Sequence, residues 1–263
     1  MTDLGAPFGE SDLLRGTRYR LHTPVLILAI ILSTASLLYY SVLAPERFGA
    51  YHDDSIYAAT AKALATSQGY KIISLPLEPA QTKYPPFYPF LLSLIWRAYP
   101  QFPENIVLLT MLSTIATLSF LALAYRYLTK HGYTTEWQAL IVVGLAAINW
   151  RTMILATSIY SEMVYAAFSV AALYLAERGE ASKRGRDVLL GIVIGMAFLT
   201  RTSGLTLLLS ITVYYVLRRR WGKALVVFGV GSHQRHAYSG RGADESGPIK
   251  RLARIANRHR KGR

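Results

Sequence analysis

Apolar residues in this chain gather in blocks that are separated by short polar stretches. The first block, Pro24–Leu43, contains no charged side chain. A helix of about twenty apolar residues crosses a hydrocarbon layer of about 30 Å, so the block predicts a membrane span. It is longer than the apolar part of a signal peptide and no small-x-small cleavage site follows closely, so we expect the span to be retained.

Further apolar blocks each predict a helix: Ile106–Leu128, Trp137–Ile148, Met163–Leu175, Val188–Thr200, Leu205–Leu217 and Ala224–Val230. Several are shorter than a full span. They cross a membrane if flanking Ser, Thr and Tyr residues are included, or if the helices break inside the bilayer against their neighbours. The pattern predicts an all-α fold, a multi-pass bundle of about five to seven membrane helices over residues 24–230.

Basic residues cluster at alternate connections between the blocks. The clusters are Arg15/Arg18/Arg20, Arg126/Lys130, Arg178/Lys183/Arg184/Arg186 and Arg218/Arg219/Arg220/Lys223. Positive charge favours the cytoplasmic side, which places these clusters and residues 1–23 in the cytoplasm. The segment Ala44–Glu104, with as many acids as bases, is then extracytoplasmic.

This outer segment is the longest connection, and long connections are usually functional. Residues Asp54–Gln68 predict an Ala-rich helix that lies on the membrane surface and ends at Gly69. One face of it carries Ile56, Tyr57, Ala61 and Leu64. In "KYPPFYPFLLSLIWRAYP" (Lys83–Pro100) the prolines predict an extended entry to a second, aromatic-rich helix at headgroup level.

Composition supports a membrane protein, since 52% of the residues are apolar and 17% are charged, against about 25% in soluble domains. The absence of cysteine excludes disulfides, thiol chemistry and Cys-based metal sites. The net charge of +14 is concentrated in residues 231–263, which hold nine of the 29 Lys and Arg. We interpret them as a basic, disordered tail that binds nucleic acid or anionic lipid, or as a truncated or frame-shifted end. The short block before the tail favours truncation, so we expect no nucleic-acid partner.

Adjacent carboxylates, Asp53 and Asp54, open the predicted surface helix. Capping of that helix needs one of them. The other is available as a general base toward an acceptor hydroxyl, and partial burial would raise its pKa into a useful range. A metal held by both carboxylates and His52 is a third interpretation, which three consecutive residues rarely satisfy. We therefore expect no metal.

Charged residues near predicted helix ends provide further candidates. Lys83 either extends to the membrane interface or balances a lipid phosphate. Glu162, in "SEMVYAAF", is either a functional ionisable group or an acid that complements the helix dipole, with Ser158 or Ser161 as cap. Arg201, in "FLTRTSG", lies on the outer side, where it can bind a phosphate. Arg151 has a similar but weaker context. No nucleotide-binding loop or Ser-His-Asp spacing is present.

Four motifs together resemble the polytopic membrane glycosyltransferases that use lipid-phosphate-linked sugars, such as protein O-mannosyltransferases and aminoarabinose transferases. They are "HDDSIYAATAKALATSQGY", "KYPPFYPFLLSLIW", "SEMVYAAF" and "GIVIGMAFLTRTSGLTLLL", between Pro24 and Val230. The resemblance implies a family-39-like transferase with the GT-C fold, in which a sugar moves with inversion from polyprenyl phosphate to an acceptor hydroxyl. It needs no nucleotide and no cofactor, and the acceptor is a protein, a lipid or a glycan.

The resemblance also implies roles for individual residues. Asp53 matches the catalytic base, and Asp54 stands where the family often has Glu. Lys83 matches the lysine that contacts the donor phosphate, with Arg201 as a further phosphate contact. Tyr57, Tyr84 and Glu162 complete the expected substrate pocket. Family members continue through more spans and often into an outer domain, so the resemblance implies that this sequence is only the N-terminal part of such a transferase.

Two other functions remain open. One is a non-catalytic transporter or assembly subunit, although no inverted repeat is visible. The other is an inactive fragment of such a transferase, with the basic tail as accidental sequence. In each case we expect a multi-pass protein of a bacterial inner membrane, with any active site on the extracytoplasmic side.

Overall fold

The chain is all-α over the residues that the computed structural model describes, which are 23–50, 52–177 and 184–230. The helices are α1 (Thr23–Ser41), η1 (Pro45–Arg47), α2 (Asp53–Ala65), α3 (Phe87–Ala98), α4 (Ile106–Lys130), α5 (Glu136–Ile148), α6 (Trp150–Ala156), α7 (Glu162–Ala176), α8 (Arg184–Thr200) and α9 (Gly204–Leu217), followed by a helix over Trp221–Val230. An isolated antiparallel bridge joins Lys71 to Ala80. The predicted cytoplasmic segment and the basic tail 231–263 lie outside the described residues, apart from Thr23.

Each predicted apolar block forms a helix, with ends within a few residues of those expected. Helix α6 was not predicted as a separate element. It follows α5 after a break at Asn149, and the axes of the two helices differ by 65°. The Asn149 side chain accepts a hydrogen bond from the backbone N–H of Arg151, so it ends one helix while it caps the next.

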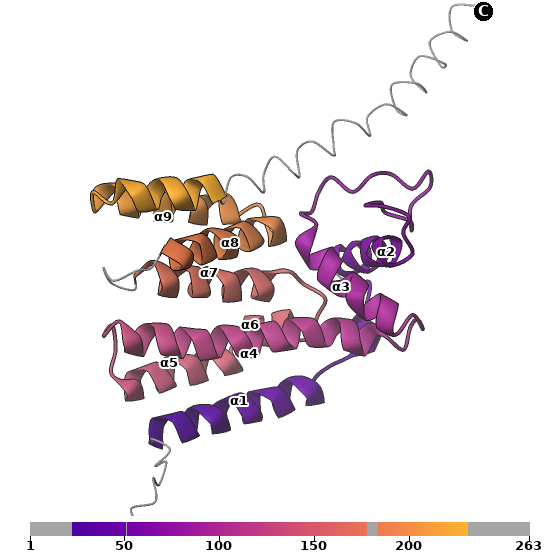
Figure 1. Cartoon of the computed structure of the whole chain (residues 1–263). Helices are drawn as coiled ribbons and strands as arrows, with labels where there is room; N and C mark the ends of the chain where they lie inside the picture. Colours follow the sequence, from indigo (N-terminus) through magenta and orange to yellow (C-terminus); the bar gives the residue numbers. More distant parts are fainter. Residues whose placement is uncertain (1–22, 51, 178–183, 231–263) are drawn as a thin grey trace, which may run out of the picture.

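The long helices stack side by side in the order α1, α4 with α5, α7, then α8 with α9 (Figure 1). Three apolar clusters hold the stack together. One joins α1, α4, α5 and α6, a second joins α2, α3, α4 and α7, and a third joins α7, α8, α9 and the last helix. Since α4 and α7 each contribute to two clusters, they connect the outer helices to the rest of the molecule.

Helices α2 and α3 lie together at one end of the stack, whereas the connection between α4 and α5 lies at the other end (Figure 1). The connection that contains Ser161 is also at the α2 end, because the Ser161 side chain hydrogen-bonds to Tyr57 of α2. Connections predicted to be extracytoplasmic therefore share one end of the molecule. The cluster Arg126/Lys130 lies at the other.

Two helices, α1 and α4, are long and apolar enough to cross a membrane, and the bent pair α5–α6 gives a third if it forms one span. The expectation of five to seven spans is thus met only in part, because α7, α9 and the last helix are apolar but shorter. Large apolar side chains are exposed along these helices, among them Leu37 at 71% and Leu217 at 78%. Large exposed apolar side chains along helices of this length are consistent with a membrane-facing protein.

The surface helix predicted over Asp54–Gln68 is present but shorter, and the prediction about Gly69 is wrong. Helix α2 ends at Ala65, and Ser67 takes the left-handed conformation after it, with φ +60°. The N–H of Gln68 then bonds to the carbonyl of Ala63 at 2.9 Å, as in a Schellman motif. Gly69, with φ +88°, turns the chain into the next loop instead.

Candidate functional site

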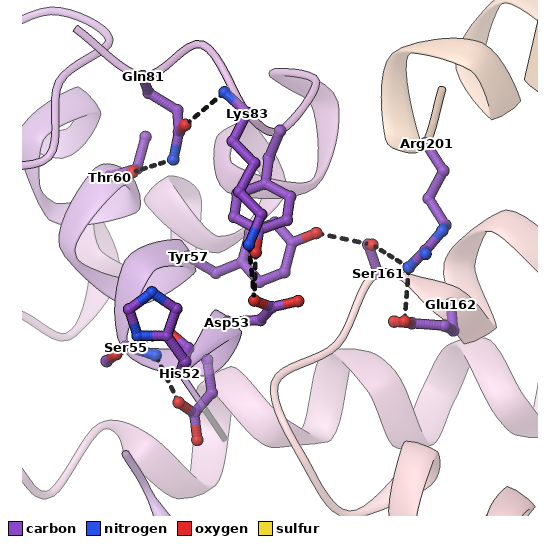
Figure 2. Close-up of polar contacts among 12 residues, drawn as sticks. His52, Asp53, Ser55, Tyr57, Thr60, Gln81, Lys83, Ser161, Glu162 and Arg201 are labelled. Atoms are coloured by element: carbon purple, nitrogen blue, oxygen red, sulfur yellow. Dashed lines mark hydrogen bonds and ion pairs between the residues drawn. The ribbon is translucent and has the colours of Figure 1, made fainter. Parts of the chain in front are cut away.

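The carboxylate of Asp53 lies in the first turn of α2 and binds two side chains from the loop before α3. Its Oδ1 accepts a hydrogen bond from Lys83 Nζ at 3.3 Å and another from the hydroxyl of Tyr84 (Figure 2). Its Oδ2 has no partner among the described residues. The Asp53 side chain is 37% exposed and that of Lys83 is 61% exposed, so the pair remains accessible to a ligand.

The contacts within this trio keep Lys83 charged and Tyr84 neutral. Hydrogen bonding to Tyr84 and then to Asp53 raises the pKa of the Lys83 ammonium, although desolvation opposes it. Partial burial, and secondly the hydrogen bond to Asp53, raises the pKa of the Tyr84 hydroxyl. Tyr84 therefore remains a hydrogen-bond donor to the carboxylate, and Lys83 remains a cation.

The backbone that carries Lys83 and Tyr84 is held by two polar side chains. Gln81, which is buried, accepts the N–H of Lys83 at 2.9 Å through its Oε1 and donates through Nε2 to Thr60 of α2 at 3.5 Å. The Tyr70 hydroxyl donates to the carbonyl of Tyr84 at 2.8 Å. These bonds hold the loop against α2, and Pro85 and Pro86 restrict its backbone further.

Asp54 points away from this trio and into the protein. Only 3% of it is exposed, its Oδ2 accepts the N–H of Gly49 at 2.9 Å, and its Oδ1 accepts the N–H of Ser55 at 2.6 Å. Neither carboxylate is the N-cap, because that position is His52, whose side chain makes no capping bond. Asp54 thus joins the start of α2 to the preceding loop, and Asp53 is the carboxylate that is left for chemistry.

A second cluster of polar side chains contains Ser161, which directly precedes α7, together with Glu162 and Arg201. The Ser161 Oγ lies 2.9 Å from the hydroxyl of Tyr57 and accepts a hydrogen bond from Arg201 Nη1 at 3.3 Å. The same Nη1 lies 2.5 Å from Oε1 of Glu162. Ser161 occupies the N-cap position but does not cap α7 with its side chain, so the capping role considered for it is wrong.

In the Glu162–Arg201 ion pair, only one carboxylate oxygen of Glu162, Oε1, contacts the arginine. The Oε2 atom of Glu162 is buried and has no hydrogen-bond partner among the described residues, although a third of the whole side chain is exposed. Arg201 follows α8 directly, and a sharp turn leads to Gly204 at the start of α9. A Cβ on Gly204 would lie 2.4 Å from the backbone of Phe198, so this close return requires glycine.

Tyrosine rings connect the two polar groups. The ring centroids of Tyr57 and Tyr84 are 4.5 Å apart, and those of Tyr57 and Tyr88 are 4.9 Å apart. The Tyr88 hydroxyl lies 3.0 Å from Ser113 Oγ on α4. Burial raises the pKa of Tyr57, so its hydroxyl stays protonated beside Ser161. The site thus has an aromatic floor, with charged groups on both sides of it.

Six of the seven predicted site residues come together here: Asp53, Tyr57, Lys83, Tyr84, Glu162 and Arg201 (Figure 2). They come from α2, the loop before α3, the start of α7 and the turn after α8. Asp54 is adjacent in sequence but faces elsewhere. Arg151 is not part of the group and stacks over the ring of Trp150 at 4.8 Å.

The sequence does not single out the residues that connect the two polar groups. Ser161 was considered only as a cap, and Gln81 was not considered, because neither belongs to a recognisable motif. A signal for Gln81 was its position two residues before Lys83. In the described part of the chain, no three His, Asp or Glu side chains are grouped as a metal ion would require.

Comparisons of the chain with protein-family models, with curated proteins and with solved structures found no match. The resemblance to lipid-dependent glycosyltransferases therefore rests on the sequence motifs alone.

Proposed function

We propose that this chain is a membrane glycosyltransferase. In this proposal it moves a sugar from a polyprenyl-phosphate donor to an acceptor hydroxyl on the extracytoplasmic side. The helices α1, α4 and α5–α6 cross the membrane, and the shorter apolar helices complete a GT-C-like bundle. The site formed by Asp53, Lys83 and Arg201 then faces the outer surface of a bacterial inner membrane.

The convergence of the site residues is the observation that supports the proposal. A carboxylate with one oxygen that has no partner among the described residues, two cations and a tyrosine floor gather at one end of the helix stack, although they come from four separate segments. Basic, acidic and aromatic side chains in one partly exposed site suit a phosphate, a hydroxyl and a sugar ring, respectively.

The proposed reaction is a single displacement at the anomeric carbon. Asp53 accepts the proton of the acceptor hydroxyl through Oδ2, and the acceptor oxygen forms the new bond to that carbon. The bond from the carbon to the phosphate oxygen breaks at the same time, and its electron pair leaves with polyprenyl phosphate. Lys83 and Arg201 stabilise the added negative charge on this leaving group. Attack from the face opposite the leaving group inverts the anomeric configuration.

Substitution of Asp53 by Asn tests the assignment of the base. General-base catalysis contributes about 10²–10⁴-fold, so we expect transfer from a radiolabelled polyprenyl-phosphate sugar to fall by at least a hundredfold. The variant should still insert into the membrane, since Asp53 is partly exposed and its contacts are at the surface.

A matched control is Glu46→Gln, which removes an exposed acid from η1 and should leave transfer unchanged. Transfer by Asp53→Asn at the rate of the unsubstituted protein would refute Asp53 as the base.

A further inference from the structure

Both cations of the proposed site are already paired with carboxylates. Lys83 Nζ lies 3.3 Å from Asp53, and Arg201 Nη1 lies 2.5 Å from Glu162. Within each pair the cation and the carboxylate neutralise each other, and the Tyr57–Ser161 hydrogen bond lies between the two pairs (Figure 2). An anion therefore meets no unpaired cation at these two positions.

Each pair is arranged so that it can be opened. All four side chains are at least a third exposed, and ion pairs with that access to water are weak. Each carboxylate also uses only one of its oxygens for its cation, and Oε2 of Glu162 is buried without a partner among the described residues. A phosphate offers three or more acceptor oxygens and can bind both cations at once.

We propose that the donor phosphate binds by exchange of partners, displacing Asp53 from Lys83 and Glu162 from Arg201. This inference rests on the proposed function and describes how donor binding releases the carboxylate of the same site. Without a donor, Lys83 holds the carboxylate of Asp53 in an ion pair at 3.3 Å. With the donor bound, the ammonium contacts phosphate and the carboxylate is released to accept a proton.

The exchange also affects how tightly the two cations hold the phosphate during the reaction. A donor that carries both a prenyl chain and a sugar is a phosphodiester with one negative charge, whereas the departing polyprenyl phosphate is a monoester that approaches two. The cations therefore bind most tightly as the bond to the sugar breaks, which favours the transition state over the bound donor.

The test measures the affinity of the full chain for polyprenyl phosphate in lipid nanodiscs. Because the carboxylates compete with phosphate, Asp53→Asn and Glu162→Gln should each bind it about twofold to fivefold more tightly than the unsubstituted protein. Lys83→Met should bind it more weakly. In the double variant Lys83→Met/Asp53→Asn the gain from Asp53→Asn should disappear, since no cation is released.

Glu46→Gln is the control for a general effect of losing one negative charge. It removes an exposed acid that pairs with neither Lys83 nor Arg201. Its affinity should not change. Thermal unfolding of each variant checks that the fold is intact, and Asp53→Asn and Glu162→Gln supply two independent tests if one of them is unstable. Inorganic phosphate is titrated in parallel and should bind more weakly than the lipid, with the same order of variants.

Several results would overturn the exchange. Equal or weaker binding by both Asp53→Asn and Glu162→Gln would do so, as would an equal gain in Glu46→Gln. Inorganic phosphate that binds as tightly as polyprenyl phosphate would show that a free anion, not the lipid, is the ligand. If the unsubstituted protein binds neither, the proposed function fails and the exchange fails with it. Binding without any gain in the variants refutes the exchange alone.

Discussion

Two neighbouring residues, Asp53 and Asp54, show how different the roles of adjacent carboxylates can be. Asp54 is buried and bonded to the backbone on both sides, whereas Asp53 contacts Lys83 and Tyr84 across about thirty residues of chain. A helix places successive side chains about 100° apart, so Asp54 faces the loop that precedes α2 and Asp53 faces the candidate site.

Tyr84→Phe tests whether the hydroxyl of Tyr84 positions the Asp53 carboxylate. The ring would still pack against Tyr57, but the hydrogen bond to the carboxylate would be lost. Removal of a hydrogen bond to a charged group costs about 1.5–3 kcal/mol, so we expect kcat to fall at least tenfold. The KM for the donor should change little, because Lys83 remains.

The control for Tyr84→Phe is Tyr99→Phe, which alters a partly exposed tyrosine beyond the end of α3. Steady-state kinetics of both variants give the comparison. A fall in kcat of the same size in Tyr99→Phe, or an unchanged kcat in Tyr84→Phe, would contradict the positioning role.

The sequence predicted the residues that carry charge better than those that connect them. Asp53, Lys83, Glu162 and Arg201 stand out because charges near membrane helices are rare and costly. Ser161 and Gln81 do not stand out, because Ser and Gln are ordinary in loops and their value depends on which segments meet. That information is tertiary, and a pattern along the chain does not contain it.

Among the elements, helices were predicted well because long apolar blocks leave few alternatives. The predictions were less accurate where a helix breaks or ends. Asn149 divides α5 from α6 without a glycine or proline, and Ser67 takes a left-handed conformation that Gly69 was expected to provide. At Asn149 a side-chain capping bond decides where α5 ends and α6 begins, whereas at Ser67 hydrogen bonds of the local backbone decide where α2 ends.

The turn from α8 to α9 offers a test at this scale, because it presents Arg201 to Glu162. In Gly204→Ala the new Cβ would lie 2.4 Å from the backbone of Phe198, so the turn must open. Overpacking of this kind costs about 1–3 kcal/mol. We expect a lower thermal midpoint together with weaker binding of polyprenyl phosphate.

Gly222→Ala is the matched control, since a Cβ at Gly222 would meet open space in the last helix. Alanine has the higher helix propensity by about 1 kcal/mol, so this variant should be as stable as the unsubstituted protein or more so. Thermal unfolding that gives both variants the same midpoint would show that the turn does not need glycine.

The whole molecule has two chemically different ends, and the account requires them to lie on opposite sides of a membrane. One end carries α2, α3 and the candidate site, and the other carries Arg126, Lys130 and the arginines after α9 (Figure 1). The predicted orientation follows from the positive-inside rule.

Cysteine labelling tests this orientation directly, because the natural chain contains no cysteine. Single cysteines would be placed at Ser74 in the outer loop and at Lys130 at the end of α4, both of which are exposed. A membrane-impermeant maleimide should label Ser74→Cys in intact cells, and Lys130→Cys only after the inner membrane is permeabilised. The reverse pattern would invert the topology and place the candidate site in the cytoplasm.

The most direct test of the account is whether the bond between sugar and phosphate breaks. The purified chain would be reconstituted into liposomes with a panel of polyprenyl-phosphate sugars and candidate protein, lipid and glycan acceptors. Free polyprenyl phosphate would then be measured by mass spectrometry, together with the glycosylated acceptor. We expect both products to form in equal amounts, and Asp53→Asn to form both at least a hundredfold more slowly. Movement of the intact sugar lipid across the bilayer, with no polyprenyl phosphate released, would contradict it and identify a transporter.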